Sequence, residues 1–201
     1  MQYLKDEVRN SIAQGALKEF MEKGYEGASV RSIAKASGTS VGNIYKYFKS
    51  KEDIYENIIG SVYDKLVNYI GQFDEVELNE KAEAVFNQLI EKLMKIFDES
   101  SHEISTLLNQ SVGSKYENCK ELFVDFITRI VTESMEYELS KRGKKLADNF
   151  NIYLVSRSLV DSISIIVREK EDGTEVRKLV LNMIDIYYTG LADKLECKDL
   201  N

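Results

Sequence analysis

The chain has 201 residues, a formal net charge of −7, 43% hydrophobic residues, two cysteines and no proline. This length is sufficient for one or two domains with a hydrophobic core. The start of the chain lacks the apolar segment of a secretory signal, and no run of eighteen apolar residues is present, so we expect a cytoplasmic protein without a membrane span. Cys119 and Cys197 are far apart and isolated, which predicts no metal site and no cofactor held by cysteine.

The first predicted helix covers about Gln2 to Lys23. No stretch alternates apolar and polar residues as a half-buried strand would, so helix is expected throughout and the fold class is all-α. The first helix has an apolar stripe at a spacing of four, and Gly24 ends it. The stripe consists of Leu4, Val8, Ile12, Ala16 and Phe20.

Two short helices follow, and a glycine turn joins them. Ser29 is a suitable N-cap for the first, which ends near Gly38. Thr39 or Ser40 can cap the second, which we expect to run through Phe48. This pattern is typical of a helix-turn-helix, although an ordinary helical hairpin with tyrosines in its core has the same outline.

The outward residues of the second short helix have the chemistry of a DNA groove reader. Gly42 allows close backbone approach, Asn43 can pair with an adenine edge, and a Val41 methyl can meet a thymine methyl. Hydroxyls and charges of the kind that hold phosphates surround them. These are Tyr45, Lys46, Tyr47, Lys49 and Lys51.

The charge distribution favours the DNA-binding interpretation. Residues 1–50 carry 8 Lys and Arg against 5 Asp and Glu, a net charge of +3, whereas residues 51–201 carry 19 against 29, a net charge of −10. Between residues 31 and 50 there are four basic residues and no acidic one. One basic patch on an acidic protein therefore coincides with the predicted groove reader.

This segment resembles the N-terminal signature of the TetR family of bacterial transcriptional regulators. The residues that carry the resemblance are Gly24-Tyr25, Ser29-Val30, Ile33-Ala34, Ala36-Ser37-Gly38, Ser40-Val41-Gly42, Tyr45-Lys46-Tyr47-Phe48 and Ser50-Lys51-Glu52-Asp53-Ile54. The resemblance implies a three-helix DNA-binding domain, a C-terminal helical domain that dimerises and often holds a small-molecule inducer, and repression that the ligand relieves.

The resemblance also implies roles for individual residues. Arg31, Ser40, Val41, Gly42, Asn43 and Lys46 would face bases or the nearby sugar-phosphate, and Tyr45, Tyr47 and Lys51 would clamp phosphates. Tyr47 departs from the many relatives that have His there, but it keeps a phosphate donor.

The rest of the chain predicts a helical body. We expect a long helix from Ser50 to Gln72, a helix that starts between Asp74 and Asn79 and ends near Phe97, and further helices over His102–Ser111, Lys115–Arg142, Asn149–Lys170 and Gly173–Leu191. The basic run 141–145 lacks aromatic residues, so we interpret it as a solvated loop. The predicted domains are 1–49 for DNA binding and 50–201 for ligand binding and dimerisation.

The last two predicted helices favour a homodimer. The helix over Asn149–Lys170 is apolar on two sides and therefore has to be covered on both. We predict that these two helices pair with their copies in a second subunit. The interface residues would be Tyr153, Val160, Val167, Val180, Ile184 and Tyr187.

A small-molecule site is the least specific prediction. An apolar pocket with a few polar points could be lined by Phe86, Met94, Phe97, Asn109, Tyr116, Phe123, Phe126 and Tyr153, although residues of these types are more often plain core. The acidic body is compatible with a cationic effector, but charge on a helical domain is usually a solvated face. The sequence names no compound.

The expected function is that of a homodimeric repressor, which binds a near-palindromic double-stranded DNA operator and is released by a small-molecule effector. An enzyme is not expected, because one His and two isolated Cys form no catalytic group. A helical protein-protein adaptor would leave the basic reader unexplained. An activator, or a regulator without an effector, stays open as an alternative.

Overall fold

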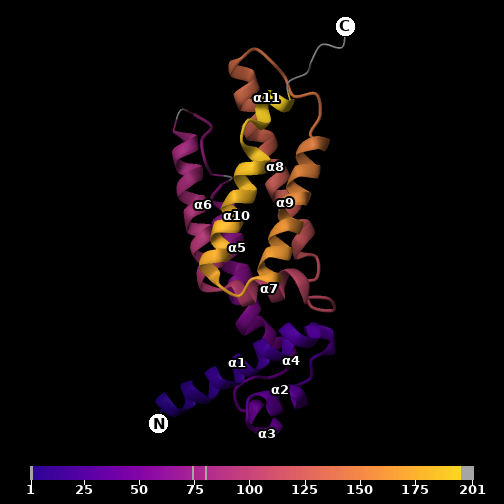
Figure 1. The fold of residues 1–201 in the computed structure, drawn as a ribbon. Helices are drawn as coiled ribbons and strands as arrows, with labels where there is room; N and C mark the ends of the chain where they lie inside the picture. The colour runs from indigo at the N-terminus through magenta and orange to yellow at the C-terminus, as the bar shows by residue number, and fades with distance from the viewer. Residues whose placement is uncertain (1, 74, 80, 196–201) are drawn as a thin grey trace. The chain divides into compact units, whose positions relative to one another are not determined.

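The structure is a computed structural model that describes residues 2–73, 75–79 and 81–195, without the side chains of residues 2–5 and 83. All of the regular elements among these residues are helices (Figure 1). In chain order they are α1 (Gln2–Gly27), α2 (Val30–Ala36), α3 (Val41–Ile44), α4 (Lys51–Tyr55), η1 (Glu56–Gly60), α5 (Ser61–Gly71), α6 (Ala82–Glu99), α7 (Ser101–Asn109), α8 (Cys119–Lys141), α9 (Phe150–Glu169), α10 (Gly173–Tyr188) and α11 (Leu191–Leu195). The predicted all-α fold is confirmed.

The regular part of the first helix stops at Gly24, where the sequence predicts the end of the helix. Gly24 has φ 71°, a left-handed value that glycine adopts without steric cost, and the helical turn after it extends α1 to Gly27. The apolar stripe faces inward, since Ile12, Ala16 and Phe20 are fully buried. Leu4, the first residue of the predicted stripe, lies outside the described side chains.

Three serines cap the helices of the N-terminal region. The side chains of Ser29, Ser40 and Ser50 accept hydrogen bonds from the backbone N–H groups at the starts of α2, α3 and α4. Each bond satisfies an N–H group that has no partner inside its helix. The three predicted helix starts are therefore confirmed.

The long helix expected from Ser50 to Gln72 is divided by a π-helical turn, η1. Gly60 closes this turn, and the hydroxyl of Tyr116 lies where a β-carbon at position 60 would stand. The sequence pattern misses this interruption, because the apolar spacing of four continues across it.

Other boundaries differ from the predictions by a few residues. The second helix of the helix-turn-helix ends at Ile44 and gives way to a turn, instead of continuing through Phe48. Helix α6 begins at Ala82, after Asn79 has accepted a hydrogen bond from the Lys81 backbone N–H at 2.8 Å. Asp74, an alternative predicted start, lies outside the described residues.

The chain forms two compact units. The first combines Met1–Lys65 with Ser100–Cys119, so α7 packs with α1 and η1 although it lies far along the chain. Figure 1 shows α3 at the opposite end of this unit from α7. The core of the first unit contains Ile12, Phe20, Ile33, Ile44, Tyr55, Ile104 and Leu107.

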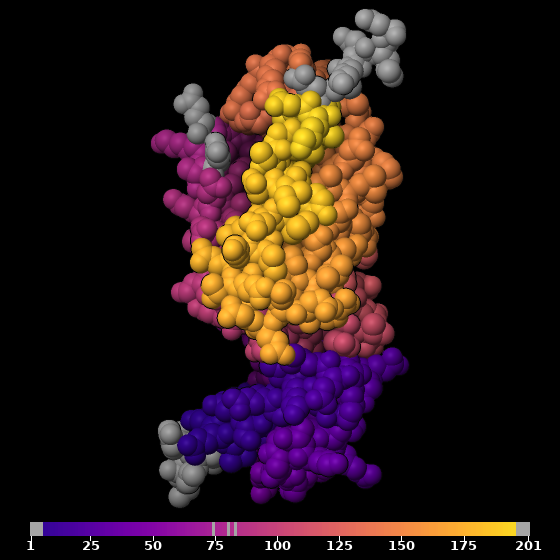
Figure 2. All heavy atoms as spheres, in the orientation of Figure 1, coloured from indigo at the N-terminus to yellow at the C-terminus, as the bar shows by residue number. Residues whose placement is uncertain are grey.

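The second unit combines Leu66–Glu99 with Lys120–Asn201. Its helix α10 packs against α6 and against α9, and it lies between these two helices on the face drawn in Figures 1 and 2. Ion pairs join its helices at the surface. The pairs are Arg157–Glu121, Arg177–Glu91 and Arg142–Asp193.

Helix α9 is long and apolar enough to cross a membrane by length and composition, with a mean hydropathy of 1.4. In the second unit, however, one side of α9 packs on α10, and Arg157 of α9 pairs with Glu121 of α8. These contacts are those of a helix in a bundle.

Candidate nucleic-acid interface

The turn between α2 and α3 is fixed by backbone hydrogen bonds. Gly38 has φ 64° and donates its N–H to the Lys35 carbonyl at 3.2 Å, while Thr39 donates to the Ala34 carbonyl at 2.9 Å. This pair of bonds is the Schellman arrangement, which closes a helix through a left-handed glycine. Ser40 then caps α3, which starts at Val41, so the direction of α3 relative to α2 is set within a few residues.

The inner side of the helix-turn-helix is apolar and closed to solvent. Ile33 and Ala34 of α2, Ile44 of α3 and Phe48 after it are 0–4% exposed. Burial of such side chains contributes about 1.5–3 kcal/mol each for the larger ones. The core therefore holds one side of α3 inward and leaves the opposite side to solvent.

The predicted DNA-binding residues of α2, of α3 and of the residues next to α3 are mostly accessible to solvent. Arg31, Ser40, Gly42, Tyr45 and Lys46 are exposed, with Tyr45 55% exposed, and Val41, Asn43 and Tyr47 are half-buried. The basic residues Lys35 and Lys49 are exposed as well, and no acidic residue occurs between positions 31 and 50. The surface thus combines polar groups and positive charge, as a phosphate-binding surface requires.

Gly42 has no steric reason inside the protein to be a glycine. A β-carbon there would meet no atom of the described residues within 4 Å, and its φ lies outside the left-handed region. Glycine inside a helix costs about 0.5–1 kcal/mol relative to alanine. Close approach of a binding partner to the backbone at position 42 would explain why a glycine occurs there despite this cost.

Lys51 differs from the other predicted phosphate contacts, because its side chain is turned toward the protein. Its ammonium donates hydrogen bonds to the carbonyls of Tyr25 at 2.7 Å and Ala28 at 3.1 Å, and it lies 4.2 Å from the centre of the Tyr25 ring. These contacts tie α4 to the end of α1. The structure therefore gives Lys51 a role in holding the unit together, which the sequence did not suggest.

Tyr25 connects the same helices through its hydroxyl. The hydroxyl donates to the Glu52 carboxylate at 2.8 Å, and the Tyr25 backbone N–H donates to the Gln110 carbonyl at the end of α7 at 2.8 Å. Burial, together with the Glu52 carboxylate, raises the pKa of Tyr25 to about 12. Tyr25 therefore links α1, α4 and α7 and stays protonated at neutral pH.

A second link joins the end of α4 to the residues after α7. The Tyr55 hydroxyl forms a buried 2.8 Å hydrogen bond with the Ser111 hydroxyl, and the Tyr55 ring packs edge-on against Phe20 and Tyr25. Sequence reasoning missed Gln110 and Ser111, since no local pattern connects residues that are 56 or more positions apart from their partners.

Arg9 is another residue that sequence reasoning did not select. Its guanidinium donates to the Asn57 side chain at 2.5 Å and lies 5.5 Å from the centre of the Phe48 ring. Arg9 thereby connects α1 with Asn57 of η1 and with Phe48, a core residue of the helix-turn-helix. A cation over an aromatic ring contributes about 0.5–1 kcal/mol at an exposed site.

The predicted ligand-pocket residues are divided between the two units. Asn109 and Tyr116 belong to the first, whereas Phe86, Met94, Phe97, Phe123, Phe126 and Tyr153 belong to the second. Tyr116 packs against the rings of Tyr55 and Tyr63. Met94, Phe97, Tyr116 and Phe123 are buried. No single unit therefore contains all eight.

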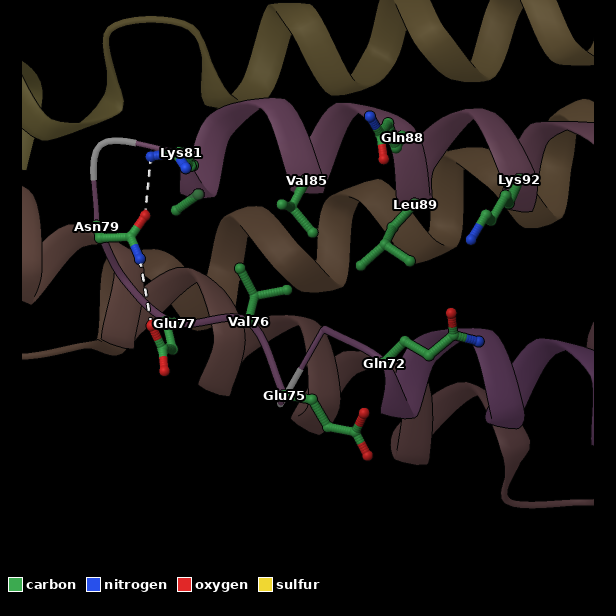
Figure 3. A pocket seen from close by; sticks show the side chains of 11 residues that line it. Gln72, Glu75, Val76, Glu77, Asn79, Lys81, Val85, Gln88, Leu89 and Lys92 are labelled. Atoms are coloured by element: carbon green, nitrogen blue, oxygen red, sulfur yellow. Dashed lines mark hydrogen bonds between the residues drawn. The ribbon is translucent and has the colours of Figure 1, made fainter.

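A hollow of about 430 Å³ lies elsewhere in the second unit, between the end of α5, the segment 75–79 and α6. In Figure 3, Val76 points toward Val85 and Leu89 of α6, and polar side chains surround this apolar contact. The lining contains Gln72, Glu75, Val76, Glu77, Asn79, Lys81, Ala82, Val85, Gln88, Leu89 and Lys92, none of which is among the predicted pocket residues.

The predicted dimer residues are not all available to a second subunit. Val160, Val167 and Val180 are 3%, 3% and 0% exposed, because α9 and α10 bury them against their own chain. They belong to the core of the subunit. Tyr153, Ile184 and Tyr187 are half-buried. The exposed apolar residues on these helices are Phe150, Leu154 and Ile165 on α9 and Ile186 on α10.

Comparison with known proteins places the N-terminal region in a family. Residues 12–58 match the family model of bacterial regulatory proteins of the tetR family. The chain is 30% identical over 89 residues to the biofilm operon icaADBC HTH-type negative transcriptional regulator IcaR of Staphylococcus aureus. That match covers 44% of this chain and 47% of IcaR, so the similarity extends over about half the length of the relative.

Solved structures share the fold over most of the chain. The fatty acid degradation regulator FadR of Bacillus halodurans matches with a TM-score of 0.53 and 20% identity, over 92% of this chain and 96% of FadR. NalD of Pseudomonas aeruginosa, the secondary repressor of the MexAB-OprM multidrug efflux pump, matches with a TM-score of 0.52 and 15% identity, over 96% and 98%. These relatives are named as regulators or repressors rather than as enzymes. Residues 12–58 of the chain therefore carry the signature of the tetR family of bacterial regulatory proteins.

Proposed function

We propose that this protein is a cytoplasmic DNA-binding transcriptional regulator, a homodimeric repressor that a small-molecule effector releases from its operator. The observation that carries the proposal is the outer side of α3. It combines an open glycine and a half-buried asparagine above a closed apolar core, and exposed basic residues flank it on α2 and after α3. Backbone and side-chain groups of this kind suit the major groove of DNA.

The proposed contacts divide into two classes. Val41, Gly42 and Asn43 would meet base edges, while Arg31, Ser40, Tyr45, Lys46 and Tyr47 would meet the sugar-phosphate backbone. Lys51 would act mainly by holding α4 against α1, because two carbonyls already engage its ammonium. In this division, only the first class carries sequence information.

The proposed dimer would supply the two reader helices, about 34 Å apart, that a palindromic operator requires. The apolar residues Phe150, Leu154, Ile165 and Ile186 are 44–63% exposed on α9 and α10. Apolar side chains that recur on one pair of helices are typical of an interface. A copy of the same two helices would cover them in a four-helix arrangement.

The dimer has a direct test in solution. Ile165→Asp places a charge on the proposed interface, and Val112→Asp is its control, because Val112 is an exposed apolar residue of the first unit. Sedimentation velocity at micromolar concentration should give a dimer for the unaltered protein and for Val112→Asp, and a monomer for Ile165→Asp. A monomer without any substitution would contradict the dimer.

Repression is proposed over activation because IcaR is named as a negative regulator and NalD as a repressor. The effector would bind in the part of the chain after residue 49, which we propose as the ligand-binding and dimerisation domain, with 1–49 as the DNA-binding domain. The hollow beside α6 offers an apolar floor with polar side chains around it, a composition that small-molecule sites share.

Selection of bound DNA from a random pool tests the main proposal. Enrichment of an inverted repeat, followed by its release on addition of single compounds from a library, is the expected result. A helical protein-protein adaptor would enrich no sequence. An inverted repeat that the protein binds but that activates a reporter gene would keep the DNA-binding role and contradict repression.

A further inference from the structure

One hydrogen bond on the outer side of the helix-turn-helix joins two side chains that are four residues apart. The Asn43 side-chain amide donates to the Thr39 hydroxyl at 2.9 Å. Thr39 precedes the N-cap of α3, and Asn43 lies in the first turn of that helix. Both side chains are half-buried, so the bond lies at the edge of the surface proposed to meet DNA.

The Thr39 end of this bond is fixed by the turn. Its backbone N–H donates to the Ala34 carbonyl at 2.9 Å, immediately after the left-handed Gly38. The backbone of Thr39 is therefore held by the end of α2, a helix whose inner residues are buried. A β-branched side chain on a fixed backbone has few rotamers, which limits where its hydroxyl can lie.

The Asn43 end is fixed by the helix cap. Its backbone N–H donates to the Ser40 hydroxyl at 3.1 Å and to the Ser40 carbonyl at 3.0 Å. With the backbone held by Ser40 and the amide held by Thr39, the side chain has lost most of its rotational freedom. The Asn43 side chain therefore loses its conformational entropy when the protein folds, and less remains to be lost when DNA binds.

The Thr39 bond uses one of the two N–H groups of the amide. Among the described residues, the other N–H and the carbonyl oxygen of Asn43 have no partner. A donor and an acceptor side by side complement the N7 acceptor and the N6 amino donor of adenine in the major groove. Gly42, beside Asn43, leaves open space for a base edge to approach.

We infer that Thr39 is a positioning residue, which orients the Asn43 amide to select an A·T base pair in each half of the DNA site. The inference rests on the proposed function and adds a specificity-determining pair to it. Asn43 contacts the adenine, and Thr39 acts only through Asn43. Among the described residues, the Thr39 hydroxyl takes part in no other hydrogen bond.

Selection from a random DNA pool, run in parallel on variants, tests the pair. Asn43→Ala should reduce the preference for adenine at one base pair per half-site by about 5- to 150-fold, the range for a bidentate pair. Thr39→Val keeps the shape of the side chain and removes its hydroxyl, and it should reduce the same preference by about 2- to 12-fold, the range for one hydrogen bond. Thr39→Ser keeps the hydroxyl and should restore the preference.

The outcomes separate this inference from the proposed function. Thermal unfolding of each variant checks that α3 is intact, and preferences at the other base pairs serve as an internal standard, because a damaged helix would lose all of them together. An inverted repeat whose base preferences are the same for the unaltered protein, Thr39→Val and Asn43→Ala overturns the inference alone. If the unaltered protein enriches no sequence, the proposed function fails and the inference falls with it.

Discussion

Substitution of Gly42 by alanine should strengthen the fold and weaken DNA binding at the same time. A β-carbon at position 42 would meet no described atom within 4 Å, so the methyl group costs nothing sterically in the free protein. Alanine in a helix is favoured over glycine by about 0.5–1 kcal/mol, because the unfolded chain loses less entropy on folding. For a chain of this length, that free energy raises the melting temperature by about 1–4 °C.

The effect on DNA binding has the opposite sign. If a base edge packs against the Gly42 backbone, an added methyl group overpacks the interface at a cost of about 1–3 kcal/mol. The dissociation constant for the selected operator should then rise by about 5- to 150-fold. Fluorescence anisotropy with labelled operator and with a scrambled duplex of equal length measures both affinities.

Gly71→Ala is the matched control. Gly71 ends α5, and a β-carbon there also meets nothing within 4 Å of the described residues. This variant should shift the melting temperature in the same direction and leave operator affinity unchanged. Operator binding by Gly42→Ala that equals that of Gly71→Ala would refute the assignment of the outer side of α3 to DNA, and a lower melting temperature would refute the open space at position 42.

Three further predictions concern the first unit. Gly15→Ala should destabilise the protein by about 1–3 kcal/mol in urea unfolding, because a β-carbon would lie 2.8 Å from the Ser37 backbone nitrogen and 2.9 Å from its Cα. An unchanged urea midpoint would contradict this close approach of α1 and the end of α2. Lys51→Met should lower the free energy of unfolding by about 1–3 kcal/mol, since it removes the donor to the Tyr25 and Ala28 carbonyls. Lys46→Ala should instead weaken binding to all DNA and leave stability unchanged. The reverse pattern would show that Lys51 is a phosphate contact and not a structural residue. Stability should fall as the pH rises from about 10 to 12, because the pKa of Tyr25 and the pKa of Tyr55 are each raised from the ordinary value of 10.0 to about 12. Over this range the folded state holds protons that the unfolded state releases. Urea midpoints measured across the range should show the decline, and Tyr25→Phe should make it less steep.

Local signals in the sequence predict the local parts of the site. The three serine caps and the left-handed Gly38 are visible in the sequence, because a cap depends on residues within three or four positions of one another. The same reasoning places Ile44 and Phe48 inward and leaves Gly42 outward. The helix-turn-helix is therefore predictable from about twenty residues.

Long-range partners are not predictable in this way. In the sequence, Lys51 is one more basic residue near the predicted DNA-binding helix. Only the folded structure brings its ammonium within hydrogen-bonding distance of the Ala28 and Tyr25 carbonyls, which lie 23 and 26 positions earlier. Val160, Val167 and Val180 fit an interface by their spacing, but spacing cannot distinguish a face covered by the same chain from one covered by a second copy. Spacing likewise cannot distinguish aromatic residues that line a pocket from aromatic residues of the core, so the eight predicted pocket residues stay a prediction.

The first unit is built from two separate segments of the chain, and this limits how chimeras with relatives can be made. The match to the family model ends at residue 58, yet the unit that carries α3 also includes Ser100–Cys119, which supplies the partners of Tyr25 and Tyr55. A chimera spliced after residue 58 or 65 would leave a buried tyrosine hydroxyl and a backbone N–H facing unrelated residues. Exchange of DNA specificity between relatives would therefore have to transplant two separate stretches of the gene, or be confined to the surface of α3.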